Sequence, residues 1–344
     1  MNDTNNMILA VFTKDRALSS SDAHALLSGK ISLVTVKRAL TELRVRGLLD
    51  RSGGGRSISY QLTRKGLLLR PFDTEQYLKQ DQEKRIVEKG FNHDLLRLPP
   101  VPVLDETELA ALTIATDKFH SRGKHNEGVA KKELERFIVE MSWKSARMEG
   151  NTYTLLDTEQ LLLHGVKSPK NTEFETQMIL NQKAAFDFVY EHKNTWHRPT
   201  VAAIEKVHEL IITGLGVKRN LRSSGVGITG TEYVPLGNAF QIREALDNLL
   251  VYVEQLSNVY EKALMLVMGI SYIQPFADGN KRTSRMVANA LLLAEGYAPI
   301  SYRAVDETVY KEACLLFYEQ NSLVAFKQLF VDQYIYSATH YNIA

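Results

Sequence analysis

The feature that most constrains the fold is a succession of long helical patterns between residues 106 and 295, with few strand patterns among them. Apolar side chains recur there every three or four residues, the spacing of a helix that buries one face. These patterns cover residues 106–115, 131–148, 173–190, 201–212, 239–259, 261–272 and 281–295. The exception is the stretch from Gly225 to Leu236, whose glycine, threonine and β-branched residues predict a short hairpin. We therefore expect a mostly α-helical domain with one short β-hairpin.

The composition limits the size, partners and compartment of the protein. With 344 residues, of which 44% are apolar, the chain can fill the cores of two domains. Its 42 lysines and arginines nearly balance 40 acidic residues, so attraction to nucleic acid has to come from local clusters. The one cysteine, Cys314, excludes a disulfide or a cysteine zinc site within one chain and is expected to be a buried thiol. Because no apolar run approaches the length of a membrane span and the N-terminus lacks signal-peptide features, we expect a cytoplasmic protein without membrane association.

The first 70 residues predict a small α+β domain. Residues 20–22 offer a helix cap before a short helical run at 23–27, and Ser32 offers a cap before a longer basic helix that ends at Gly47. A glycine-rich tip at residues 52–57 then lies between β-prone segments, which predicts a hairpin. Helix, turn, basic helix and hairpin follow one another in the order of a winged helix-turn-helix domain.

This domain has the charges for binding DNA. Its second helix would enter the major groove, and its hairpin would contact phosphates, so that binding weakens as salt is added. The alternative is a domain that mediates only protein contacts or dimerisation. The candidate DNA-contacting residues are Lys37, Arg38 and Arg44 on the helix and Arg51 and Arg56 on the hairpin.

Residues 71–104 separate the two domains. They are rich in charge, include Pro99-Pro100 and Pro102, and contain a charged run from Lys79 to Lys89. This composition predicts a linker with an exposed helix. The second domain is expected to cover residues 105–344.

The segment from Gln274 to Arg285, between two apolar helices, carries the chemistry. Its glycine and asparagine residues can aim successive backbone N–H groups at one point, and the following helix adds its positive N-terminal end, which makes an anion site. Arg282 and Arg285 lie three residues apart on that helix and can bracket phosphate oxygens, while Asp278 offers a carboxylate to magnesium. The alternative is an ordinary helix-capping loop with solvated arginines.

The order of these residues resembles the signature of the Fic family, His-Pro-Phe-x-(Asp/Glu)-Gly-Asn-(Gly/Lys)-Arg-x-x-Arg. Upstream, Ser145 to Asn151 resembles the family's inhibitory motif, Ser/Thr-x-x-x-Glu-Gly/Asn, in a helix at about 131–150. Residues 152–163 and the hairpin at about 225–236 resemble the segment after that helix and the family's target-clamping flap. The resemblance implies a Fic-type helical bundle from about residue 105 to the C-terminus, with the winged helix as an appended module.

Family members typically move AMP from ATP to a hydroxyl of a target protein, and the resemblance assigns roles to individual residues. Phe276 would anchor the loop in the core, Ser145 would help to hold the inhibitory helix, and Glu149 would pair with Arg285, unless Glu149 forms only a surface salt bridge. The nucleotide and its magnesium would be bound by Asp278, Gly279, Asn280, Lys281, Arg282 and Arg285. The target would meet Val226, Gly227 and Ile228. Tyr310 and Asn321 would lie near the adenine, with core packing as the alternative.

Gln274 occupies the position of the family's catalytic histidine. A neutral amide accepts a hydrogen bond but takes up no proton near pH 7, so loss of the base lowers the rate by about two to four orders of magnitude. An engineered change, a natural pseudoenzyme and a variant with altered chemistry are all consistent with this residue. His208, on an apolar helical face, is expected to pack in the core rather than to replace the base.

These observations leave three functions in competition. The favoured one is an autoinhibited adenylyltransferase that uses ATP and Mg²⁺, acts on a target protein and is impaired by Gln274. The second is an ATP-sensing transcription regulator with a catalytically dead Fic-like domain. Lys281, which also appears in Doc-like relatives, keeps a phosphotransferase open as the third. The expected partners are the target protein and DNA, and homodimer formation stays open.

Overall fold

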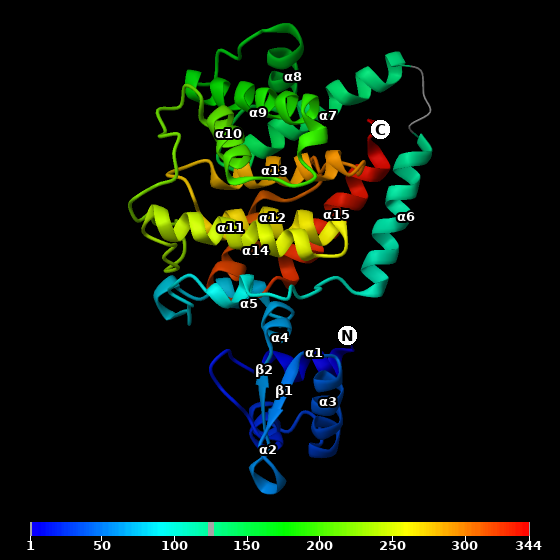
Figure 1. Ribbon diagram of the computed structural model, residues 1–344, viewed down its shortest axis with the longest axis vertical. Coiled ribbons are helices and arrows are strands. Elements are labelled where there is room, and N and C mark those ends of the chain that lie inside the picture. Colours follow the sequence, from blue (N-terminus) through cyan, green and yellow to red (C-terminus); the bar gives the residue numbers. More distant parts are fainter. Residues whose placement is uncertain (1, 123–126, 344) are drawn as a thin grey trace.

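The computed structural model describes residues 2–122 and 127–343, without the side chains of Arg56 and Glu127. Two parts lie along the long axis of the molecule, a small N-terminal one and a large helical one (Figure 1). The described elements of the small part are α1 (Asp3–Ala10), α2 (Ser20–Leu26), α3 (Leu33–Val45), β1 (Leu49–Ser52), a 3₁₀ turn (Gly55–Ser57), β2 (Ser59–Leu62) and α4 (Arg64–Leu68).

The small part has the elements that its sequence predicts, in the predicted order. Helix α2 begins earlier than predicted, because Ser19 rather than residues 20–22 caps it, in a capping box with Asp22. The Ser32 side chain accepts a hydrogen bond from the Thr35 N–H at the start of α3, as predicted. Strands β1 and β2 pair antiparallel, with Leu49 opposite Leu62 and Ser52 opposite Ser59. Helix α1, which the sequence analysis did not predict, contributes Ile8 and Leu9 to a separate hydrophobic core shared with α2 and α3.

Residues 71–104 pack against the large part. They contain α5 (Thr74–Leu78) and two 3₁₀ turns (Gln82–Lys84 and His93–Leu96). The prediction of an exposed helix across residues 79–89 is wrong, because this run forms only a 3₁₀ turn and its last residues hydrogen-bond to the large part. The Glu88 N–H donates to the Glu319 carbonyl at 2.9 Å, and the Lys89 carbonyl accepts from the Val234 N–H at 2.8 Å.

The two parts join through a buried arginine. Arg70 donates from Nη1 to the Phe12 carbonyl at 2.6 Å and from Nη2 to Gln320 Oε1 at 2.7 Å. The Ser322 hydroxyl in turn donates to the Arg70 carbonyl at 2.6 Å. Burial lowers the pKa of Arg70 to about 10, so the side chain remains charged at neutral pH and holds both parts together.

The large part is a helical bundle built around α12 and α13, which pack along each other at its centre (Figure 1). Its elements match the helical patterns of the sequence, with α8, α14 and α15 in addition. Among the described residues, no helix combines the length and apolar character needed to span a membrane. The helices are α6 (Glu106–Arg122), α7 (Glu127–Arg147), α8 (Leu155–His164), α9 (Glu173–Glu191), α10 (Val201–Ile212), α11 (Ala239–Gln255), α12 (Val259–Ile273), α13 (Asn280–Ala294), α14 (Glu307–Gln320) and α15 (Val324–His340), with a 3₁₀ turn at Lys193–Thr195.

The segment predicted as a hairpin, residues 225–236, is an extended loop. Two arms flank a turn at Thr229 and Gly230, and no ladder of backbone hydrogen bonds joins the arms, all of whose residues are described. The outer arm pairs with the Lys89 carbonyl through Val234, and this outside partner replaces pairing within the hairpin. The mostly helical fold class is confirmed. Residues 225–236 turn back on themselves like a hairpin, but their two arms are not paired as β-strands.

Candidate functional site

A sharp loop connects the two central helices. Helix α12 ends at Gln274, whose backbone is left-handed (φ 51°, ψ 59°), and α13 begins after Gly279, with φ 81°. A Cβ at Gly279 would lie 3.2 Å from the Ile212 side chain, closer than ordinary packing. Glycine thus meets both the backbone angle and the tight contact with α10, and the turn brings the N-terminus of α13 to the surface of a cavity.

Asn280 ties this loop together. Its Oδ1 accepts from the Phe276 N–H at 2.8 Å, and its Nδ2 donates to the Phe276 carbonyl at 2.9 Å and to Gln274 Oε1 at 2.8 Å. The Phe276 ring is fully buried and stacks on His208 with the ring centres 3.6 Å apart. Burial lowers the pKa of His208, and its Nε2 lies 3.0 Å from the Asp278 carbonyl, so this histidine packs behind the loop. His208 and Phe276 both occupy the core, as the sequence predicts.

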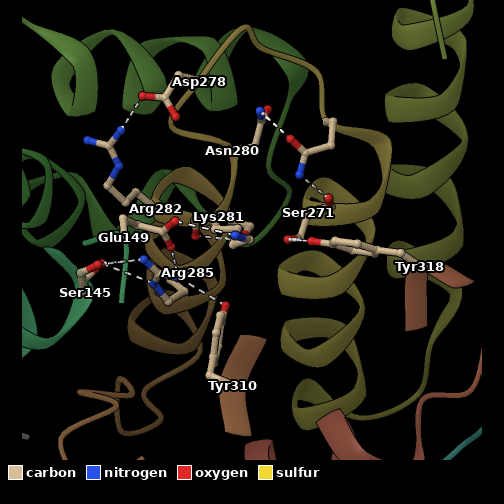
Figure 2. Close-up of polar contacts among 12 residues, drawn as sticks. Ser145, Glu149, Ser271, Asp278, Asn280, Lys281, Arg282, Arg285, Tyr310 and Tyr318 are labelled. Carbon is tan, nitrogen blue, oxygen red and sulfur yellow. Dashed lines mark hydrogen bonds and ion pairs between the residues drawn. The ribbon is translucent and has the colours of Figure 1, made fainter. Parts of the chain in front are cut away.

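The Gln274 side chain is engaged at both ends of its amide. Nε2 donates to the Ser271 carbonyl at 2.7 Å, and Oε1 accepts from Asn280 (Figure 2). Arg222 supports the same residue from the other side, because its Nε donates to the Gln274 carbonyl at 2.6 Å. The sequence analysis missed Arg222, which lies 52 residues away in the chain and has no local pattern that marks it.

Arg282 lies behind Asp278. Its Nη2 is 3.0 Å from Asp278 Oδ2, and the guanidinium is 2% exposed. Burial lowers the pKa of Arg282, although the Asp278 and Glu149 carboxylates oppose this shift. Two of its buried N–H donors, Nε and Nη1, have no hydrogen-bond partner among the described residues. The guanidinium therefore has unused donor capacity beside an exposed carboxylate.

Arg285 is held by the segment at the end of α7. Its Nη1 lies 3.0 Å from Glu149 Oε1, and its Nη2 donates to the Ser145 carbonyl at 2.9 Å and to the Ser145 hydroxyl at 3.1 Å (Figure 2). A second cation, Lys281, has its Nζ 3.6 Å from Glu149 Oε2. Burial alone would raise the pKa of Glu149, but the attraction of Arg285 and Lys281 lowers it, so the carboxylate is ionised at neutral pH.

A cavity of about 380 Å³ opens in front of these groups. Glu149 and the loop between the central helices form its floor, and the inner arm of residues 225–236 forms one wall. Helix α14 forms a further part of the wall. The lining residues are Glu149, Val226, Gly227, Ile228, Thr229, Gln274, Ala277, Asp278, Gly279, Asn280, Lys281, Lys311, Cys314, Leu315 and Tyr318.

The contribution of α14 differs from the sequence prediction. Tyr310 does not line the cavity but places its hydroxyl 3.2 Å from Arg285 Nη1, and Asn321 is buried against Asn92, which donates to it at 2.8 Å. Core packing, the alternative given for these two residues, describes their positions. The face of α14 that lines the cavity was missed because no helix was predicted there. Its residues are Lys311, Cys314, Leu315 and Tyr318.

Cys314 is the buried thiol that the sequence predicts. It lies at the edge of the cavity with 1% of its surface exposed, and burial raises the pKa of its thiol to about 12. A thiol with such a pKa remains protonated near pH 7 and is a poor nucleophile. Cys314 therefore contributes shape rather than reactivity to the cavity wall.

Two carboxylates among the described residues line the cavity, and because Glu149 is paired with Arg285 and Lys281, Asp278 is the candidate metal ligand. The described residues contain no group of three or more histidine, cysteine, aspartate or glutamate side chains arranged for a metal ion. Asp278 is 60% exposed, and Arg282 engages only its Oδ2. This environment fits magnesium, which keeps several waters and is bound in nucleotide sites through one or two carboxylates and the phosphates.

The candidate DNA-contacting residues with described side chains are exposed on the small part. Lys37, Arg38 and Arg44 project from α3, away from its buried Val36 and Leu40 stripe. The Arg51 side chain is exposed on β1, and the side chain of Arg56 lies outside the described residues. The candidate residues whose side chains are described, Lys37, Arg38, Arg44 and Arg51, are thus all exposed.

Comparison with known proteins agrees with this geometry. Residues 198–292, from the start of α10 into α13, match the family model of the Fic/DOC family. The chain contains a Fic/DOC domain. Protein adenylyltransferase Fic from Nematostella vectensis is 26% identical to the chain over 226 residues, which cover 62% of this chain and 51% of the relative. The protein of that name from Aedes aegypti is 27% identical over 210 residues, covering 57% and 40%. The chain thus spans about half the length of these curated relatives, or less.

Solved Fic structures share the fold of the large part. A Fic domain containing signaling protein from Bacteroides thetaiotaomicron has a TM-score of 0.57 at 19% identity and covers 67% of this chain and 94% of its own. Fic-1 (residues 134–508) from C. elegans has a TM-score of 0.57 at 17% identity, with 68% and 72% covered. At these identities the likeness concerns the fold, and it confirms the predicted Fic-type helical bundle.

Proposed function

We propose that this chain is an ATP-binding Fic protein with the architecture of a protein adenylyltransferase, autoinhibited through Glu149 and impaired in transfer by Gln274. The observation that carries the proposal is the contact of Glu149 Oε1 with Arg285 Nη1 at 3.0 Å, at the floor of the cavity. A guanidinium pairs with a carboxylate and with a phosphate in the same planar geometry, so the two compete for one arginine. Glu149 would thus occupy the site of a terminal phosphate.

The remaining groups fit the rest of a nucleotide. The backbone N–H groups at the start of α13, with Gly279 and Asn280, would bind the inner phosphates, and the cations of Lys281 and Arg282 would balance their charge. Asp278 would hold magnesium, which neutralises phosphate charge when bound. The wall formed by α14, rather than Tyr310 or Asn321, would accommodate the base.

The reaction we assign to this architecture is AMP transfer, the activity in the name of the relatives. A hydroxyl oxygen of the target attacks the α-phosphorus, the bond to pyrophosphate breaks, and the hydroxyl proton passes to a base. The flap residues Val226, Gly227 and Ile228 would hold the target beside that hydroxyl. Because the Gln274 amide takes up no proton, transfer falls by about two to four orders of magnitude while nucleotide binding persists.

Two measurements test this proposal. Calorimetric titration with ATP should detect binding that requires Mg²⁺, and binding should tighten in Glu149→Gly because the nucleotide no longer displaces a carboxylate. The double variant Gln274→His with Glu149→Gly should transfer label from α-³²P-ATP to protein, whereas Gln274→Ala with Glu149→Gly should not. Label from γ-³²P-ATP would instead indicate phosphate transfer, the Doc-like alternative. If Mg-ATP binds and neither label is transferred, the assigned reaction is wrong.

The exposed basic residues on α3 and β1 support a second candidate, a DNA-binding regulator that senses ATP. In that case an electrophoretic mobility shift should respond to Mg-ATP in the unmodified Gln274 protein, and introducing histidine should not change this response. The adenylyltransferase proposal predicts instead that DNA binding does not respond to Mg-ATP and that Gln274→His restores transfer. A small domain that mediates only protein contacts would give no salt-dependent shift with any DNA tested.

A further inference from the structure

The flap, residues 225–236, has a free backbone edge. Its inner arm, residues 225–229, faces the cavity through Val226 to Thr229. Among the described residues, the N–H and carbonyl groups of this arm have no hydrogen-bond partner. An extended segment with unused donors and acceptors can pair with another extended chain.

Each end of this inner arm is fixed by a buried arginine. At its base, Arg222 Nη1 donates to the Ser224 carbonyl at 2.7 Å, while Arg222 Nε holds the carbonyl of Gln274. At its turn, Arg85 Nη2 donates to the Gly230 carbonyl at 2.6 Å. Each end of the inner arm is therefore fixed by a hydrogen bond from one arginine to one backbone carbonyl.

Arg85 is itself held by the body of the protein. Its guanidinium, 5% exposed, lies 3.4 Å from Oε1 of Glu319, which is fully buried on α14. Glu319 also accepts a hydrogen bond from the Tyr77 hydroxyl at 2.8 Å. Because α14 lines the cavity, Arg85 connects that helix to the turn of the flap.

The outer arm is fixed independently of Arg85. Tyr233 is buried, and its hydroxyl donates to the Tyr272 carbonyl at 2.9 Å. The Val234 N–H donates to the Lys89 carbonyl, and Lys89 pairs with Glu232 at 2.9 Å. Removing the Arg85 side chain should consequently loosen the turn and the inner arm while the outer arm stays attached.

We propose that Arg85 is a positioning residue for target binding. Through its hydrogen bond to the Gly230 carbonyl, it fixes the free edge of the flap in the position from which an extended target segment presents its hydroxyl to the cavity. The proposal rests on the proposed function, since it concerns the substrate side of the same site. The side chain of Arg85 would touch neither the target nor the nucleotide.

Proteolysis of the flap tests this role without any activity. In the full chain with Gln274, Arg85→Met should increase thermolysin cleavage within residues 225–230 about tenfold, the effect of losing one hydrogen bond from a charged group. The control is Lys84→Met, since Lys84 is the neighbouring cation and, within the described part of the chain, its side chain pairs with Asp81 alone, on the exposed surface. Its cleavage should equal that of the unmodified protein. Equal flap cleavage in Arg85→Met and Lys84→Met would overturn the proposal.

A kinetic split separates positioning from general destabilisation. In the Gln274→His, Glu149→Gly background, Arg85→Met should lower the rate of self-labelling from α-³²P-ATP and leave the KM for ATP unchanged. A parallel loss of ATP affinity would overturn the proposal, because it would mean that the whole cavity is disturbed. If Arg85→Met does not fold, Arg85→Lys is used in its place. Its flap cleavage should exceed that of Lys84→Met, and equal cleavage would overturn the proposal. If the unmodified protein binds no Mg-ATP, the proposed function is wrong. The cleavage comparison then still tests whether Arg85 fixes the flap.

Discussion

Replacing Glu149 by glutamine should weaken the resting structure and strengthen its response to nucleotide. The change keeps the size of the side chain and removes its charge, so Arg285, with a side chain 3% exposed, loses its carboxylate partner. Removing one partner of a buried ion pair costs about 3–5 kcal/mol. Because the Ser145 carbonyl and hydroxyl and the Tyr310 hydroxyl remain as partners, we expect the lower end of that range, about 3 kcal/mol.

Thermal unfolding with and without Mg-ATP measures both effects. A loss of about 3 kcal/mol lowers the melting temperature by roughly 6–12 °C in a domain of this size. The matched control is Glu133→Gln on α7, which removes the same charge from an exposed pair with Arg136 and should shift it by less than about 2 °C. Mg-ATP should stabilise Glu149→Gln more than the unmodified protein, because its phosphates replace the missing negative charge.

The pH dependence gives an independent check on the same pair. The pKa of Glu149 in the folded protein lies below its ordinary value of 4.5. The ionised carboxylate therefore makes its full contribution to the free energy of unfolding at pH values above 4.5. The difference in melting temperature between the unmodified protein and Glu149→Gln should therefore stay constant from pH 8 to about pH 5 and shrink at lower pH. The reasoning would be refuted if Glu149→Gln had the same melting temperature as Glu133→Gln at every pH. It would also be refuted if Mg-ATP raised the melting temperature of Glu149→Gln no more than that of the unmodified protein.

Three further predictions concern other parts of the molecule. Arg38→Ala with Arg44→Ala should weaken DNA binding and reduce the slope of log K against log salt by about 1.8, measured by fluorescence anisotropy; an unchanged slope would exclude α3 from the interface. Phe276→Ala should lower the free energy of unfolding by about 3–5 kcal/mol in urea titrations, because the fully buried ring leaves a cavity against His208; a cost under about 1 kcal/mol would mean that the loop does not depend on this anchor. Asp278→Asn should make ATP binding insensitive to EDTA, and retained magnesium dependence would assign the metal elsewhere.

Local sequence patterns were sufficient for most of the helices and for the loop at the centre of the site. The cap residues of the small part, the apolar periodicity and the glycine before α13 act over a few residues, and a sequence displays them directly. The contact between Glu149 and Arg285 spans 136 residues, and the resemblance of two motifs to the Fic family indicated it. Residues whose partners are distant and carry no motif, such as Arg85 and Arg222, could not be found in this way.

The errors have physical causes of the same kind. The run from Lys79 to Lys89 has the charge spacing of an exposed helix, but hydrogen bonds to Glu319 and Val234 outcompete the local structure. Tyr310 and Asn321 were placed near the adenine by the resemblance alone, and because no helix was predicted there, the side of that helix that faces the cavity could not be derived. Helix α14 packs against α5 and α15, and its face with Lys311, Cys314, Leu315 and Tyr318 lines the cavity.

The left-handed backbone at Gln274 limits what mutation can place there. Valine, isoleucine and threonine would be strained at φ 51°, whereas histidine, asparagine and aspartate are the residues that adopt this region most readily after glycine. Glutamine and histidine codons differ only at the third base. A lineage with this turn can therefore lose a general base, or regain one, in a single nucleotide step that leaves the main chain as it is.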